Sequence, residues 1–100
     1  MMDVMFEWDE EKRLRTLAAR GIDFVDAAQI MLESVYEYRS DRGDESRFVA
    51  VGPLKDGTLI AVIYTMREQK FRIITARRAW PHEQRTYLHA VSAAKNEGRD

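Results

Sequence analysis

The segment Thr58–Met66 is apolar at almost every position, and no other segment constrains the fold as strongly. Successive side chains of an extended strand point to opposite faces of a sheet. One face of this segment would carry Leu59, Ala61 and Ile63, and the other would carry Ile60, Val62 and Tyr64. A strand that is apolar on both faces is usually covered on both sides by the rest of the protein. We therefore expect a sheet in which this strand is central.

Turn signals flank this strand on both sides and predict antiparallel neighbours. The Asp-Gly pair in Lys55–Gly57 is a strong hairpin signal, and Arg67–Gln69 forms the next short turn. We place the neighbouring strands at Arg47–Val51 and Lys70–Arg77, with Gly52-Pro53 ending or bulging the first of them. Short hairpins of this kind give a largely antiparallel sheet.

The parts of the chain on either side of these strands predict two further strands and three helices. Asp9 and Asp23 are natural helix N-caps, Gly21 suits a helix C-terminus, and Pro81 suits a first helical position. These signals predict a strand at 4–8, helices at 10–20 and 24–31, a strand at 34–39 and a helix that begins at Pro81.

The resulting order is strand, helix, helix, four strands, helix, which belongs to the α+β class. We expect the helices to cover one face of the small sheet. The first helix would turn Leu14, Leu17 and Ala18 toward that face because these residues follow helical spacing. The other face of the central strands still carries apolar groups, so it is either a groove or a surface that a partner covers.

The 100 residues suit one domain, residues 1–100, with a frayed tail at 95–100. The chain has no cysteine, which excludes a disulfide, a thiol nucleophile and a thiolate metal site. His82 and His89 are two helical turns apart, too far to share one metal ion, and we expect no metal and no cofactor. No apolar run is long enough for a membrane span and no signal peptide is evident, so we expect a cytoplasmic protein.

The net charge of −1 hides an asymmetry between the two halves of the chain. Residues 1–46 hold 6 Lys/Arg and 12 Asp/Glu, whereas residues 47–100 hold 10 Lys/Arg and 5 Asp/Glu. Solvation of an ordinary surface explains many such patterns. The basic excess, however, falls on strands and turns, which favours a surface that binds a polyanion.

Two adjacent arginines, Arg77 and Arg78, end the last predicted strand, and Glu83 and Tyr87 follow on the last helix. Guanidinium groups suit phosphate, and preorganised positive charge is often the largest contribution to catalysis. A carboxylate and a phenol nearby could assist proton transfer. We therefore predict a catalytic site for RNA backbone cleavage at these four residues.

Regular alternation would point the two arginines to opposite faces of the sheet. Arg77 would then share a face with Phe71 and Ile73, and Arg78 would share the other face with Arg72. Only one arginine could then reach a common groove, unless the chain bends there.

Each candidate in this region also has a structural alternative. One arginine could pair with Glu83 and tether the last helix, and Glu83 could orient an arginine instead of accepting a proton. Tyr87 lies on the apolar stripe of its helix, where core packing with a hydrogen-bonded hydroxyl is common. Further RNA contacts are predicted at Arg47, Arg67 and Arg72 and at Trp8, which could stack a base or belong to the core.

Residues in both halves of the chain form one ordered pattern. In the first half these residues are Phe6-Glu7-Trp8-Asp9, Lys12, Gly21-Ile22, Phe24 and Asp26-Ala27-Ala28. In the second half they are Arg47, Gly52, Gly57, Val62-Ile63-Tyr64-Thr65, Arg67, Arg72-Ile73-Ile74, Ala76-Arg77-Arg78-Ala79, Glu83 and Tyr87. In these residues and their order, the chain resembles the BrnT toxin family over roughly residues 6–88.

The resemblance implies a RelE-like fold and an endoribonuclease toxin of a type II toxin–antitoxin pair. Such a toxin would cleave RNA without a metal ion and thereby arrest translation. It implies a BrnA-like ribbon-helix-helix antitoxin as partner, operator DNA bound only through the complex, and a dimer or heterotetramer with the antitoxin. It also makes Lys12 a candidate catalytic contact to phosphate, although a solvated lysine is the alternative.

The chain departs from the family pattern in two places. Thr16, Ala19 and Arg20 stand where the family usually carries Asn, Lys and His, and Trp80-Pro81-His82 replaces a stretch that is usually polar and basic. These departures keep two other functions open. The chain could be a catalytically weak scaffold for antitoxin binding and operon repression, or an RNA-binding module that does not cleave.

Overall fold

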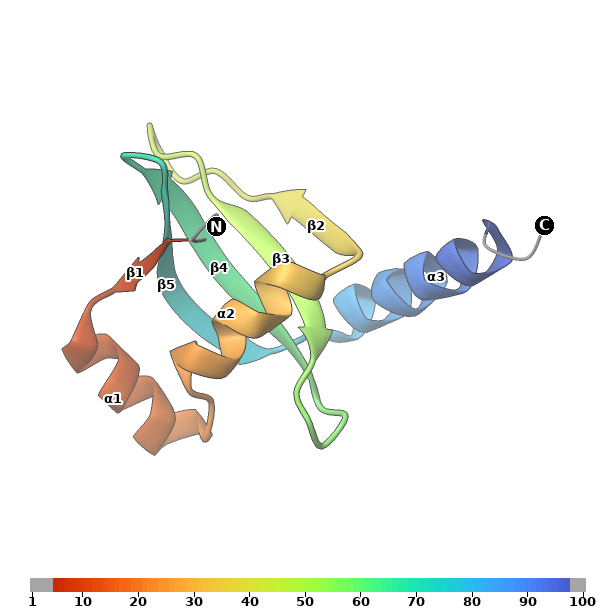
Figure 1. Cartoon of the computed structure of the whole chain (residues 1–100), viewed down its shortest axis with the longest axis horizontal. Helices are drawn as coiled ribbons and strands as arrows, with labels where there is room; N and C mark the ends of the chain where they lie inside the picture. The colour runs from red at the N-terminus through yellow and green to blue at the C-terminus, as the bar shows by residue number, and fades with distance from the viewer. Residues whose placement is uncertain (1–4, 98–100) are drawn as a thin grey trace.

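The chain folds around a single five-stranded sheet with three helices (Figure 1). A computed structural model describes residues 5–97. Its elements are β1 (Phe6–Trp8), α1 (Glu10–Arg20), α2 (Phe24–Glu33), β2 (Tyr36–Arg39), β3 (Phe48–Pro53), β4 (Leu59–Arg67), β5 (Lys70–Arg78) and α3 (Pro81–Glu97). The predicted order of elements and the α+β class are confirmed.

The strand order is β1-β5-β4-β3-β2, so the strand that is apolar on both faces occupies the centre. Antiparallel pairing joins β2 to β3, β3 to β4 and β4 to β5. The short strand β1 pairs in parallel with β5, and Trp8 lies opposite Ile73. The prediction of a central strand in a largely antiparallel sheet is therefore confirmed.

The core on one face of the sheet lies beneath α2. Phe24, Ala27 and Ile30 of this helix pack against the central strands and are buried. The helix approaches closely at Gly52, where an added Cβ would stand 2.7 Å from Cγ2 of Ile30. The sequence predicted that Gly52-Pro53 ends or bulges this strand. In the structure Gly52 instead pairs with Ile60 inside β3. Close packing between helix and sheet explains why this position has no side chain.

Helix α1 lies with its polar side inward, contrary to the prediction from its apolar spacing. Leu14 and Leu17 are exposed, whereas Thr16 is buried. Two arginines anchor the inward side: Arg13 pairs with Asp23 at 3.2 Å, and Arg20 donates to the carbonyl of Ala76 at 2.7 Å. These charged and hydrogen-bonded anchors, not the leucines, set the rotation of the helix.

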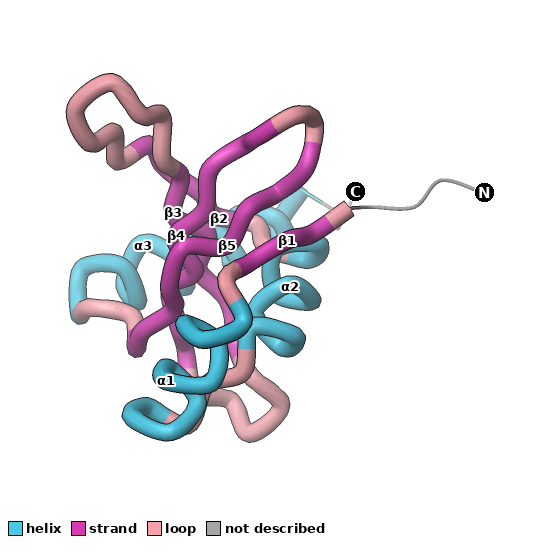
Figure 2. Tube along the Cα trace, turned by 90° about the vertical axis from the view of Figure 1, so that its left-hand side faces the viewer, coloured by secondary structure: helices cyan, strands magenta, loops and turns pink. Residues whose placement is uncertain are grey.

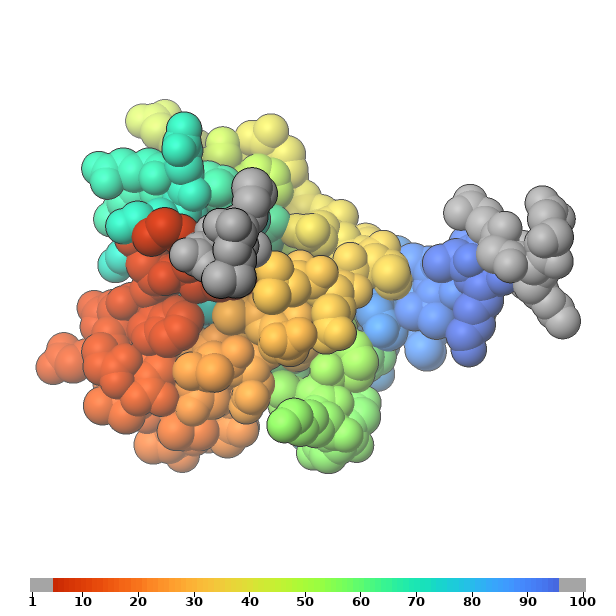
Figure 3. Space-filling view, viewed as in Figure 1, coloured from red at the N-terminus to blue at the C-terminus, as the bar shows by residue number. Residues whose placement is uncertain are grey.

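Helix α3 begins on the face opposite α2, so the expectation that the helices cover one face is wrong (Figure 2). Tyr87 packs against a second buried cluster of Val49, Val51, Ala61 and Ala79. The chain itself therefore covers part of the second apolar face. The outer part of α3 extends beyond the strands (Figure 1) and projects from the rest of the molecule (Figure 3).

A β-bulge in β5 changes the alternation of side chains along the last strand. Ile63 pairs with Thr75 and Tyr64 pairs with Ile73, so Ile74 has no partner in β4. An extra residue of this kind shifts every later side chain to the opposite face. The bulge decides which way the two adjacent arginines point.

Smaller differences from the prediction concern the ends of elements. Helix α2 runs two residues beyond its predicted end, and β3 extends through Pro53. The predicted strand at 4–8 is observed from Phe6, and its first residue lies outside the described residues. The predicted frayed tail at 95–100 is helical through Glu97, and residues 98–100 lie outside the described range. Within the described residues, the helices are too short or too polar to cross a membrane.

Candidate RNA-binding and catalytic site

Three arginines line a shallow groove at the connection between β5 and α3. Arg77 and Arg78 come from the end of β5, and Arg20 comes from the last turn of α1. Ala79, Trp80 and Pro81 complete the lining of the groove, whose volume is about 450 Å³. Three guanidinium groups around one hollow make a strongly positive site, which suits a phosphate group.

A fully buried carboxylate holds one of these arginines in place. Glu83 Oε1 accepts from Arg77 Nη1 at 2.8 Å, and Oε2 accepts from Arg77 Nη2 at 3.0 Å. The same carboxylate also accepts from the hydroxyl of Tyr38 and from the backbone N–H of Trp80, the latter at 2.7 Å. Four donors therefore fix a carboxylate that has no exposed surface.

The hydrogen bonds keep Glu83 ionised in spite of its burial. Burial by itself would raise the pKa of Glu83, but the hydrogen bonds from Arg77, Tyr38 and Trp80 outweigh it and lower the pKa to about 2. Burial and the nearby carboxylate raise the pKa of Tyr38 to about 12. Burial opposes the charge of Arg77, yet its bonds to Glu83 leave its pKa raised. The three side chains thus form a cation, an anion and a neutral phenol.

Arg77 and Arg78 point to opposite faces of the sheet, as predicted, but each lies on the face predicted for the other. Arg77 pairs across the sheet with Ala61 of the second cluster, on the face that carries Arg72. Arg78 pairs with Ile60, on the face of the α2 core. The bulge at Ile74 is the physical reason for the exchange. The chain turns after Arg78, so both arginines still line the groove.

Two residues that the sequence did not predict as site residues take part: Arg20 lines the groove, and Tyr38 contacts the buried Glu83. Arg20 departs from the family pattern, and its Nη1 donates to the carbonyl of Ala76 and to Oγ1 of Thr75, at 2.7 and 3.3 Å. Tyr38 binds Glu83 across 45 positions of sequence. The only local signal for Arg20 is a basic residue in the last turn of a helix, which is common at helix C-termini.

The remaining predicted catalytic residues lie outside the lining of this groove. Tyr87 is half-buried and packs on the second cluster. Lys12 is half-buried in the first turn of α1, where its backbone N–H donates to Asp9 Oδ1 at 3.3 Å.

The predicted RNA-contacting residues are spread over the sheet. Arg72 pairs with Glu7 at 3.1 Å, and Arg47 pairs with Glu45 at 2.7 Å. Arg67 is exposed at the end of β4. Trp8 packs edge-on against Phe24, with ring centroids 6.2 Å apart, and its indole N–H donates to Glu10. None of these four residues lines the arginine groove.

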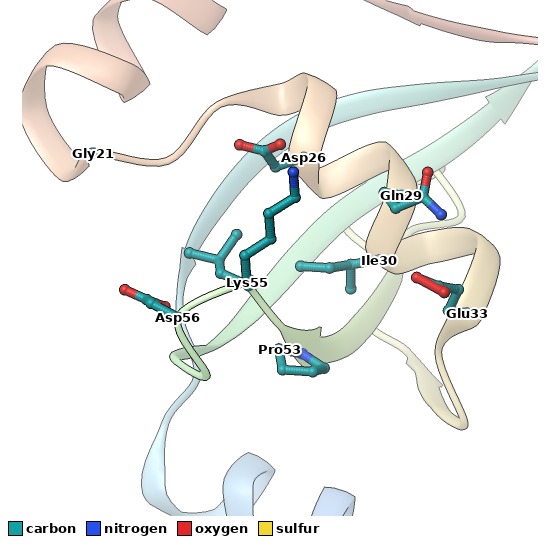
Figure 4. A pocket seen from close by; sticks show the side chains of 9 residues that line it. Gly21, Asp26, Gln29, Ile30, Glu33, Pro53, Lys55 and Asp56 are labelled. Atoms are coloured by element: carbon teal, nitrogen blue, oxygen red, sulfur yellow. The ribbon is translucent and has the colours of Figure 1, made fainter.

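A second pocket, of about 420 Å³, lies between α2 and the turn that joins β3 to β4 (Figure 4). It is lined by Asp26, Glu33 and Asp56, with Lys55 directed toward Asp26. The charged side chains of this lining are three carboxylates and one lysine, a negative balance that repels a polyanion, so the arginine groove is the better candidate for binding one. Among the described residues, no group of three or more His, Cys, Asp or Glu side chains is arranged to hold a metal ion.

Comparisons with known proteins agree with these features. A model of the family described as the BrnT ribonuclease toxin of type II toxin–antitoxin systems matches residues 8–83. The fold is similar to the crystal structure of the Brucella abortus ribonuclease toxin BrnT, with 26% identity and a TM-score of 0.60. That match covers 78% of this chain and 99% of the Brucella chain. No curated protein matches the chain. The family match ends at Glu83, so it includes the arginine groove and only the start of α3.

Proposed function

Because the chain belongs to the BrnT family of ribonuclease toxins of type II toxin–antitoxin systems, we propose that it cleaves RNA in the groove of Arg20, Arg77 and Arg78. The observation that carries this proposal is the buried Glu83, which holds the guanidinium of Arg77 by two hydrogen bonds beside two further arginines. An ion pair of this kind preorganises positive charge before the substrate arrives.

In the proposed reaction the 2′-hydroxyl oxygen of one nucleotide attacks the adjacent phosphorus and loses its proton. The bond to the 5′ oxygen of the next nucleotide breaks, and that oxygen takes up a proton. The products are a 2′,3′-cyclic phosphate and a 5′-hydroxyl end. Negative charge grows on the non-bridging oxygens, and the guanidinium groups would stabilise it without a metal ion.

The three arginines would divide this work. Arg77 is fixed by Glu83 and would stabilise the transition state, whereas Arg78 is exposed and would bind the phosphate. Arg20 is anchored on the edge of β5 and would clamp the phosphate from the side of α1.

Other side chains would support this arrangement. Glu83 serves as an orienting group because all of its oxygens are engaged and it stays ionised. Tyr87 would hold α3, and hence Glu83, against the sheet. Lys12, Arg47, Arg67 and Arg72 would add weaker phosphate contacts along the chain of the RNA.

A type II toxin has an antitoxin partner, and we propose a BrnA-like ribbon-helix-helix protein in that role. It would cover the groove, form a dimer of toxin–antitoxin pairs, and carry the complex to operator DNA. The free toxin would act on RNA in the cytoplasm and arrest translation.

Expression without the antitoxin, together with a cleavage assay in EDTA, tests the proposal. We expect growth arrest, metal-independent cleavage with cyclic phosphate ends, and loss of both in the Arg77→Ala/Arg78→Ala double variant. Harmless expression with intact RNA would favour the scaffold alternative. Tight, salt-sensitive RNA binding without cleavage would favour the RNA-binding module.

A further inference from the structure

Trp80 presents an open aromatic surface at the edge of the arginine groove. The guanidinium carbon of Arg77 lies 3.6 Å from the centroid of its ring, so one face is covered. Trp80 nevertheless stays 51% exposed. Because Arg77 covers one face, the exposed surface lies on the other face and the edges of the indole. The ring centroid of His82 lies 5.7 Å away, and its plane is tilted by 41°.

The position of this indole is well determined although it lies at the surface. The backbone N–H of Trp80 donates to Glu83 Oε1 at 2.7 Å. The covered face of the indole packs on Arg77, which Glu83 also binds. One buried carboxylate thus fixes both the cation and the ring. An aromatic group held in this way loses little conformational entropy when a second flat group stacks on it.

The open face lies next to the place where a phosphate would bind. Trp80 lines the same groove as Arg20 and Arg78. A flat aromatic surface beside clustered guanidinium groups is the combination by which proteins hold the bases and backbone of single-stranded nucleic acids. Trp8, the other tryptophan of the chain, has no such setting, since it packs edge-on against Phe24.

We propose that Trp80 stacks one nucleobase of single-stranded RNA on its free face while the neighbouring phosphate lies among the arginines. This inference rests on the proposed function and adds a substrate class to it. Bases inside a duplex are stacked on both sides and are not available to a surface indole. The toxin would therefore select unpaired RNA, and Trp80 would set the position of the scissile phosphate relative to an unstacked base.

Tryptophan fluorescence tests the stacking directly. In a Trp8→Phe variant, Trp80 is the single tryptophan, and a non-cleavable 2′-O-methyl RNA strand should quench its emission. A duplex of the same sequence should quench it weakly. Replacing one nucleotide by an abasic residue should weaken binding about 5- to 150-fold at the stacked position and little elsewhere. The abasic series also works with the unaltered chain, where binding is followed by anisotropy of a labelled strand.

Cleavage kinetics provide the second arm. Trp80→Phe should keep KM near the wild-type value, and Trp80→Leu should raise KM more than it lowers kcat. Equal affinity for abasic and intact strands, or quenching as strong with duplex as with single strand, would refute the stacking role. Wild-type protein that binds and quenches but never cleaves would instead refute the proposed ribonuclease function. The two failures are therefore distinguishable.

Discussion

Both carboxylate oxygens of the buried Glu83 bind the guanidinium of Arg77, at 2.8 and 3.0 Å, although the two residues belong to different elements. The pair joins the end of β5 to the first turn of α3. It therefore couples the attachment of a helix to the orientation of a cation in the groove. Stability and activity should respond together when this pair is changed.

Glu83→Gln tests this coupling. Glutamine keeps the shape of the side chain but loses the charge, and it cannot accept from all four donors. We expect the free energy of unfolding to fall by about 2–3 kcal/mol and cleavage to fall by about 10²–10³-fold. Urea denaturation and single-turnover cleavage measure the two effects. The exposed Glu33 provides a matched control, and Glu33→Gln should leave the stability within about 0.5 kcal/mol of wild type.

The pH dependence of stability follows from the same residue. The pKa of Glu83 is about 2 in the folded protein and near 4.5 when the residue is free. A lowered pKa contributes stability above pH 4.5, and this contribution is lost as pH falls from 4.5 to 2. Wild type should lose a few kcal/mol more than Glu83→Gln across this window. If the free energy of unfolding fell equally in the two proteins between pH 5 and pH 2, the lowered pKa of Glu83 would be contradicted.

The two adjacent arginines should behave differently when each is replaced by alanine. Arg77→Ala leaves the carboxylate of Glu83 buried without its main partner, so it should lower both stability and activity. Arg78 is exposed, so Arg78→Ala should change stability by less than about 0.5 kcal/mol while cleavage falls by about 10²-fold. Thermal unfolding and cleavage rates of both variants decide the point. Equal loss of stability in both would contradict the division of roles.

Salt dependence should report the number of groove contacts. One phosphate neutralised by Arg20, Arg77 and Arg78 predicts that the groove contributes about −0.7 to the slope of log K against log[salt] with single-stranded RNA. Arg20→Ala should make this slope less steep, by up to about 0.7. Arg42→Ala, in the exposed loop between β2 and β3, is the control with the same loss of charge. Anisotropy titrations at several salt concentrations measure both, and an equal effect of the two variants would argue against a local groove.

Gly52→Ala probes the contact between α2 and the sheet. The new methyl group would stand 2.7 Å from Cγ2 of Ile30, so we expect a loss of about 1–3 kcal/mol in the free energy of unfolding. Ile30→Ala removes the opposing atom. In that background Gly52→Ala should cost little, which urea denaturation of the single and double variants can measure. A full cost in both backgrounds would show that the contact is not the cause.

The sequence predicts the elements of this fold well because their signals are local. Two-face apolarity placed β4 at the centre, and capping residues such as Asp9 and Gly21 fixed the ends of α1. The inward side of α1 was not predictable, since Arg13 and Arg20 are anchored by groups on other elements. Helical spacing shows only which side of a helix is apolar. In α1 the ionic and hydrogen-bonded contacts of the arginines decide the orientation instead.

Part of the composition of the candidate site was predictable from the sequence, but its geometry was not. Arg77, Arg78 and Glu83 stand close together in sequence, and the alternative in which Glu83 orients an arginine describes the observed contacts. Tyr38 and Arg20 reach the site from 45 and 56 residues away, at Glu83 and Ala76 respectively, and no local pattern reveals such contacts. The exchange of faces between the two arginines depends on one unpaired residue in β5.

That unpaired residue, Ile74, reverses the alternation of side chains between the two ends of β5. Upstream of it the strand follows one alternation, and downstream it follows the other. Deleting Ile74 would restore a single alternation and keep Arg77 opposite Ala61 and Arg78 opposite Ile60. If Ile74 were instead paired with β4, every later residue would move by one position, which would turn Arg78 toward Glu83 and move Arg77 to the α2 face. The presence of the bulge therefore decides which arginine faces Glu83, and a family member's groove can be compared with this one only after its strand has been aligned through the bulge.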